Sequence, residues 1–134
     1  MLDVRRLRRL ECQAERVLMD EQLINSSRDL LTRWESGAIH SAEVHKTAEQ
    51  WYGAISVPQY PESDHRSIPI ELLTNLDALN HQLIGRCDVP AMLAFLGTAP
   101  GDELESWARW RAYWSHVDLD ERERQRGAGM YFPD

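Results

Sequence analysis

Residues 102–117, DELESWARWRAYWSHV, decide the fold class of this chain, and they hold three of its five tryptophans. On an α-helix, at about 100° per residue, the apolar members share one narrow side: Trp107, Trp110, Trp114 and Val117. The opposite side carries polar residues: Glu105, Arg109 and His116. Each buried tryptophan removes about 150–250 Å² from water. We therefore expect a helix that forms one wall of the main core.

Helical spacing of apolar residues recurs along the rest of the chain. Further helices are predicted over residues 3–21, 27–36 and 42–53, from Ser67 to Gly85, from Asp88 to about Gly97, and over 119–126. Short polar side chains stand where these helices begin and are predicted to cap them: Ser26, Ser41, Ser67, Asp88, Asp102 and Asp118. Because runs of alternating polar and apolar residues are absent, the sequence predicts a compact, single-domain, all-α bundle of six or seven helices over residues 1–134.

The boundary between the first two predicted helices is open. Asn25, Ser26 and Ser27 favour a break, whereas the apolar residues Ile24, Leu31 and Trp34 continue one stripe through it. We favour two helices. Gly37 is expected to end the second.

A proline-containing loop is predicted at about residues 56–69, SVPQYPESDHRSIP. Glu62 and His65 within it form a single E-x-x-H pattern, which supports a metal site only on a helix and in two copies. No metal is expected. After the loop, the leucines of the next helix form the cleanest apolar stripe of the chain: Leu72, Leu76, Leu79 and Leu83.

Composition and net charge limit the kinds of partner that we expect this chain to bind. The chain has 134 residues, a net charge of −7 and 43% hydrophobic residues, which suits a soluble globular domain. Although residues 1–16 carry five arginines, the overall acidic balance disfavours nucleic acid and anionic membranes as partners. It fits a basic protein partner, and it fits plain solubility equally well.

Cellular location is predicted from cysteines and hydropathy. Cys12 and Cys87 are far apart in the sequence and are expected to be free thiols, as in a reducing cytoplasm. No apolar run of about 18 residues predicts a membrane span. The first 15 residues lack the apolar segment of a secretory signal. These features predict a cytoplasmic protein.

Motifs that carry known chemistry were not found. The sequence has no phosphate-binding G-x-x-x-x-G-K-[ST] or G-x-G-x-x-G, no H-E-x-x-H and no G-x-S-x-G. We therefore expect no cofactor and no enzymatic activity.

The favoured function is binding of a basic protein through an acidic surface. Two clusters are the candidate partner-binding residues: Asp102, Glu103 and Glu105, and Asp118, Asp120 and Glu121. Asp20 and Glu21 form a smaller cluster. Clustered carboxylates speed encounter with a basic partner and mimic phosphate. Bacterial immunity proteins that neutralise a nuclease toxin have this size, charge and helix content, which is an analogy and not a family match. Acids at helix starts also favour the helix dipole, so each cluster has a purely structural explanation.

The alternative function is a small-molecule or enzymatic site among the C-terminal helices. Its polar groups would be Asp77, His81 and His116. Asp77 and His81 stand four residues apart and form either a general base or an ordinary polar pair. Oligomeric state is left open by the sequence.

Overall fold

The computed structural model describes residues 21–54 and 59–134, and all regular structure in these ranges is helical. Residues 21–35 form a helix, followed by α2 (Ser41–Ala54), α3 (Ser67–Asp77), a 3₁₀ turn (Arg86–Asp88), α4 (Val89–Leu96), α5 (Glu103–Ser115) and α6 (Leu119–Arg126). The predicted all-α bundle is confirmed. The predicted helix over residues 3–21, with its arginines and Cys12, lies almost wholly outside the described residues.

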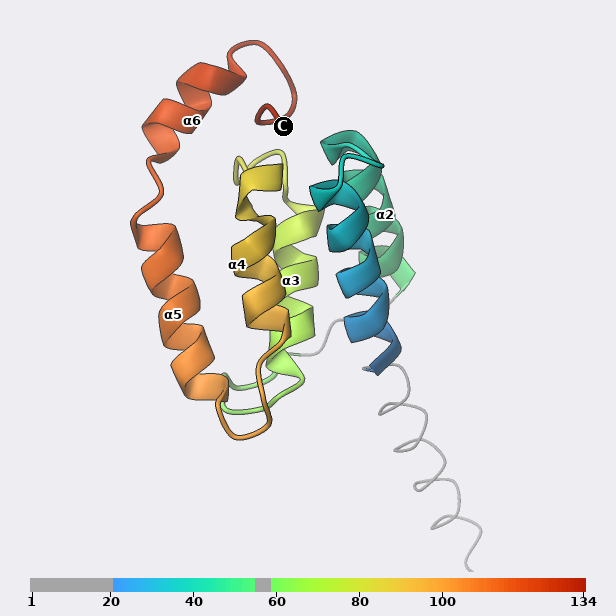
Figure 1. Cartoon of the computed structure of the whole chain (residues 1–134), viewed down its shortest axis with the longest axis vertical. Coiled ribbons are helices and arrows are strands. Elements are labelled where there is room, and N and C mark those ends of the chain that lie inside the picture. The colour runs from blue at the N-terminus through green and yellow to red at the C-terminus, as the bar shows by residue number, and fades with distance from the viewer. Residues whose placement is uncertain (1–20, 55–58) are drawn as a thin grey trace, which may run out of the picture.

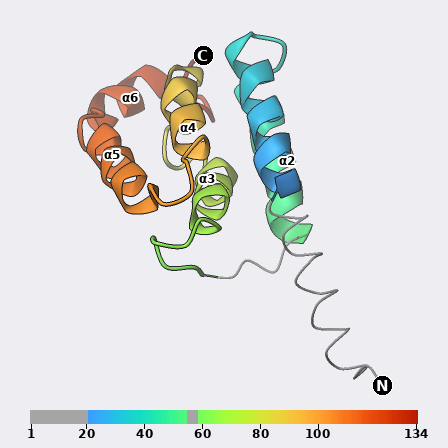
Figure 2. The same ribbon diagram turned by 60° about the horizontal axis from the view of Figure 1, so that its bottom comes forward.

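The helices pack side by side around α3. Figures 1 and 2 show α3 between α2 and α5, with α4 against α3. In Figure 1, α6 follows at the upper end of α5, and the chain then returns across the top of the bundle towards the start of α2. The last residues therefore close the bundle between its first and last helices.

The main core lies where residues 21–35, α2, α3 and α4 meet. Its most deeply buried side chains include Leu31, Trp34, Val44, Leu72, Leu76, Val89 and Met92. α5 packs on the outside of this core through Trp110, whose ring stacks on Phe95 with centroids 4.4 Å apart. Trp107 and Trp114 are half-buried against the same cluster. The predicted wall of tryptophans is therefore present, at the edge of a core built mainly of leucines.

The predicted helix break at residues 25–27 is wrong, because residues 21–35 are continuously helical. Ser27 is 1% exposed and faces inward, and Trp34 is fully buried. The low helix propensity of asparagine and serine costs only about 0.7 kcal/mol or less per residue. Burial of the large apolar residues along the same helix outweighs that cost. The predicted stop at Gly37 is confirmed, with a φ of 83°.

The predicted helix from Ser67 to Gly85 is too long: α3 ends at Asp77, and turns follow over 78–83. Leu83 adopts a φ of 56°, in the left-handed region that costs a leucine about 1–2 kcal/mol. This conformation lets the Ile84 N–H donate to the Leu79 carbonyl oxygen at 3.2 Å. A continuous helix would leave Ile84 at the margin of the leucine stripe. The turn instead buries Leu79, Leu83 and Ile84 together.

The proline-containing loop predicted over residues 56–69 is confirmed over residues 59–66. Residues 67–69 belong instead to the first turn of α3, and residues 56–58 lie outside the described ranges. Asp64 holds this loop together, because its carboxylate accepts from the Arg66 backbone N–H at 3.0 Å and from the Arg66 guanidinium at 2.6 and 3.0 Å. The hydrogen bond from the Arg66 side chain is the main cause that lowers the pKa of Asp64.

Residues 131–134 fold back onto the bundle. The Asp134 carboxylate accepts hydrogen bonds from the Ser41 hydroxyl at 2.8 Å and from the Trp34 indole N–H at 3.1 Å. His40 and Arg86 lie within 3.2 and 3.4 Å of its second oxygen. Burial alone would raise the pKa of Asp134, but the hydrogen bonds from Ser41, Trp34 and His40 outweigh burial and lower it. The predicted cap Ser41 is thus used to hold this segment.

Phe132 explains why residue 85 is glycine. A Cβ at this position would lie 2.4 Å from Cδ1 of Phe132, which is 8% exposed. The backbone of Gly85 is extended, with φ −128°, so a side chain there meets no backbone strain. The constraint is therefore steric and specific to Phe132.

We predict that Gly85→Ala lowers the free energy of unfolding by about 1–3 kcal/mol, because Phe132 must leave its position. In a Phe132→Ala background the same substitution should cost much less, since the clash is gone. Urea unfolding of the four proteins measures this coupling. Equal costs of Gly85→Ala in both backgrounds would contradict the clash.

Candidate functional site

A buried carboxylate anchors the C-terminal half of the fold. Asp88 is 0% exposed, and the Arg122 guanidinium contacts both its oxygens, at 2.6 and 2.8 Å. The Gly85 N–H donates to Oδ2 at 2.8 Å, and the Tyr113 hydroxyl donates to Oδ1. A buried carboxylate is tolerated only when it is paired and hydrogen-bonded in this way. Asp88 was predicted to cap α4, but its side chain makes no capping bond and joins α5 and α6 instead.

The Asp88 carboxylate also shifts the pKa values of the side chains that contact it. Burial, together with the Asp88 carboxylate, raises the pKa of Tyr113 from 10.0 to about 12. The hydrogen bonds to Asp88 raise the pKa of Arg122, which therefore stays charged. Its guanidinium also lies 4.8 Å from the ring centroid of Phe132 and donates to the Leu83 carbonyl oxygen at 3.0 Å. The cluster is fully satisfied internally and works as a structural joint.

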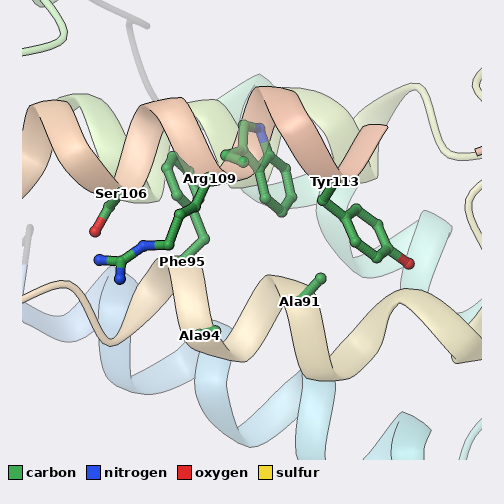
Figure 3. Close-up of a pocket in the computed structure, with 7 residues that line it drawn as sticks. Ala91, Ala94, Phe95, Ser106, Arg109 and Tyr113 are labelled. Carbon is green, nitrogen blue, oxygen red and sulfur yellow. The ribbon is translucent and has the colours of Figure 1, made fainter. Parts of the chain in front are cut away.

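An open groove runs between α4 and α5 beside this joint. It has a volume of about 380 Å³ and is lined by Ala91, Ala94, Phe95, Ser106, Arg109, Trp110 and Tyr113. Figure 3 shows Arg109 and Tyr113 extending from α5 across the space that the small residues Ala91 and Ala94 leave on α4. The groove is apolar in the middle with polar groups at its ends, an arrangement suited to a small ligand.

A second hollow lies between α2, α3 and α5. It has a volume of about 330 Å³ and is lined by Tyr52, Gln59, Tyr60, Ser67, Ile70, Glu71, Thr74 and Trp107. Three of these side chains are aromatic and one is a carboxylate. Its aromatic members are spread over residues 52–107, so no local sequence pattern indicated this hollow.

The predicted acidic cluster at the start of α5 is divided by the structure. Asp102 and Glu105 are exposed, but Glu103 is 8% exposed and turns inward. Its carboxylate lies 3.1 Å from Nδ1 of His65 and accepts from the Gly101 N–H. Backbone N–H groups of Glu103 and Gly101 are the main causes that lower the pKa of Glu103. Asp102 precedes α5 but makes no side-chain capping bond, so that predicted cap is wrong.

The second predicted cluster lies at the opposite end of α5. Asp118 caps α6 as predicted, accepting from the Glu121 N–H at 3.0 Å. Glu121 pairs with Arg124, and Asp120 is exposed. The 13 residues of α5 separate the two clusters by about 20 Å. They therefore do not form one continuous patch.

The residues of the predicted alternative pocket line neither of the two hollows. His81 is exposed in the turn after α3, and Nδ1 of the exposed His116 lies 2.6 Å from the Ala112 carbonyl oxygen. The Asp77 carbonyl oxygen contacts Nε2 of His45 at 2.9 Å. Nδ1 of His45 is 2.9 Å from the Tyr131 hydroxyl, a contact the sequence did not indicate.

Metal-ligating residues do not gather in the described ranges, where no group of three His, Cys, Asp or Glu side chains converges. Glu62 and His65 of the E-x-x-H pattern turn to other partners, Arg111 at 2.6 Å and Glu103. Cys87 is a free, exposed thiol. Within residues 21–54 and 59–134, every helix is too short or too polar to cross a membrane.

Comparisons with protein-family models, with curated proteins and with solved structures gave no match to this chain.

We predict that stability falls as the pH rises from about 10 to about 12. The pKa of Tyr113 is raised in the folded state, so its contribution is fully present below the ordinary tyrosine pKa. That contribution is lost as the pH passes through the folded value. Tyrosinate absorbance should show one residue titrating near the upper value. Tyr113→Phe should remove both effects, and an unchanged titration would contradict the assignment.

We also predict that Asp88→Asn lowers the free energy of unfolding by about 3–5 kcal/mol, because it leaves Arg122 without its buried partner. The same exchange at exposed Asp120 should change it by less than about 0.5 kcal/mol. Thermal and urea unfolding measure both. Similar small effects for the two variants would show that the ion pair is not central.

Proposed function

We propose that this chain is a non-enzymatic protein-binding module that recognises a basic protein partner through its acidic surface. The start of α5 and the loop before α3 form the binding face, here named the acidic end. Its carboxylates are Glu62, Asp64, Glu71, Asp102 and Glu105 at the surface, and Glu103, which is buried behind them. The contacts of Glu62 with Arg111 and of His65 with Glu103 place the loop against α5. Figure 1 shows these segments together at the lower end of the molecule.

The observation that carries the proposal is an imbalance of charge at the acidic end. Its six carboxylates face three arginines: Arg66, Arg109 and Arg111. Each of these arginines pairs with a carboxylate of the same end, at 2.6–3.6 Å. Asp102 and Glu71 are left without an ion pair in the described residues. At α6, by contrast, three arginines alternate with the acids, so the field there is weaker.

Such a face favours a particular kind of partner. Uncompensated carboxylates raise the rate of encounter with a basic surface and reject acidic ones. Neutralisation of a basic toxin, as by an immunity protein, is the specific function of this class that we propose. A cytoplasmic location is proposed with it.

A second candidate function is small-molecule binding in the α4–α5 groove. The stacked rings of Phe95 and Trp110 offer an apolar surface, and Arg109 supplies a positive group at its edge. This combination favours a small apolar anion rather than a basic protein.

Charge reversal at the two ends of α5 tests the main proposal. Asp102→Lys with Glu105→Lys should weaken binding of a fluorescent decalysine peptide about tenfold or more. Asp118→Lys with Asp120→Lys changes net charge equally and should weaken it less than about threefold. Titrations at about 0.05 M and about 0.5 M salt should show binding lost at high salt. Equal losses of decalysine binding in both variants would show that only net charge matters. That result would contradict the proposal that the acidic end is the binding face.

A further inference from the structure

The hollow between α2, α3 and α5 is lined by side chains from all three helices and from the loop before α3. One face of α3 supplies its floor with side chains at helical spacing: Ser67, Ile70, Glu71 and Thr74. Tyr52 from α2 and Trp107 from α5 line it from either side, and Tyr60 comes from the loop before α3. The Trp107 indole N–H donates to the Ser67 hydroxyl at 2.9 Å, which fixes the orientation of the ring.

Two of the three rings already attract cations within this fold. The Arg66 guanidinium carbon lies 4.3 Å from the ring centroid of Tyr60, and that of Arg111 lies 6.0 Å from Trp107. Both distances fall within the range of cation–π attraction. The charges of these arginines are balanced by Asp64 and Glu62, each in contact at 2.6 Å. The site therefore gains no net positive charge from them.

Glu71 provides the negative charge inside the hollow. It is half-buried, and Nδ2 of Asn75 donates to its Oε1 at 2.8 Å, which holds the carboxylate in place. Its Oε2 accepts no hydrogen bond from the described residues. No arginine or lysine lines the hollow. A charge held in this way, beside three aromatic rings, selects for a positive group with a weakly hydrated surface.

We propose that this hollow binds an alkylammonium group, with Tyr52, Tyr60 and Trp107 contacting its methyl or methylene surface and Glu71 balancing its charge. The volume of about 330 Å³ leaves ample room for such a head group. The α4–α5 groove has Arg109 in place of the carboxylate and is unsuited to the same ligand. This inference shares Glu71 with the acidic end but does not require binding of a basic protein, because it concerns a single small cation.

The experiment uses choline and its neutral isostere, in which a tert-butyl group replaces the trimethylammonium group. The indole N–H signal of Trp107 reports binding by NMR and is assigned with Trp107→Phe. Choline should shift this signal and bind at least about tenfold more tightly than the isostere. Equal binding of the two would show a merely apolar hollow, and no shift at saturating choline would show no site. Either result overturns the proposal.

Single substitutions distinguish the contribution of the Glu71 carboxylate to choline binding from that of the aromatic rings. Glu71→Gln keeps the shape and should weaken choline binding about tenfold, leaving the isostere unchanged. Glu43→Gln, an identical charge change on the exposed face of α2, should have no effect. Tyr52→Leu should weaken choline binding without unfolding the chain, as circular dichroism checks. An unchanged choline affinity in Glu71→Gln would overturn the role of the carboxylate.

A competition titration distinguishes an ammonium group on a protein side chain from one on a free small molecule. Displacement of choline by a peptide with one trimethyllysine would assign the group to a protein side chain. A peptide that fails to displace bound choline would assign it to a free small molecule. Loss of decalysine binding in the acidic-end variants, with choline binding intact, would keep the two proposals distinct.

Discussion

The buried carboxylate of Asp88 is the constraint on which the C-terminal half of the structure depends. A fully buried charge needs a partner charge and several hydrogen bonds. Arg122 from α6, Tyr113 from α5 and the Gly85 N–H supply them. Satisfying one side chain therefore fixes where α5 and α6 lie relative to the turn before α4. Arg122 extends the effect to Phe132, whose ring in turn requires glycine at position 85.

Hydrogen bonds to a second carboxylate, that of Asp134, hold together the other side of the bundle. Ser41 and Trp34 donate to Asp134, so residues 131–134 join the first half of the chain to the last. Polar side chains at helix starts were expected to satisfy local backbone N–H groups. Where such a side chain is buried, a distant polar partner competes for it, and the long-range bond prevails at Ser41 and Asp88. Exposed Asp118 has no such competitor and caps α6.

The candidate binding groups lie at one end of the molecule, where the arginines are already paired with carboxylates of the same chain. Each arginine beside the start of α5 is engaged with a neighbouring carboxylate or ring, which leaves Asp102 and Glu71 uncompensated. The aromatic hollow and the acidic end share Glu71. Attraction of a basic protein and recognition of a single ammonium group are thus two separable consequences of one excess of negative charge.

The sequence by itself determined the all-α class, the inward face of the tryptophan helix and the start of α6, because helical periodicity and an exposed cap are local properties. It overestimated α3, because a leucine stripe records burial and not the backbone path that achieves it. It also placed a break at residues 25–27, since local propensity carries no information about the core behind Trp34. Only the tertiary structure decided that Glu103 turns inward, and that Tyr52, Glu71 and Trp107 meet. Those outcomes depend on contacts between residues 19 or more positions apart, where no sequence spacing specifies which side chains will be neighbours.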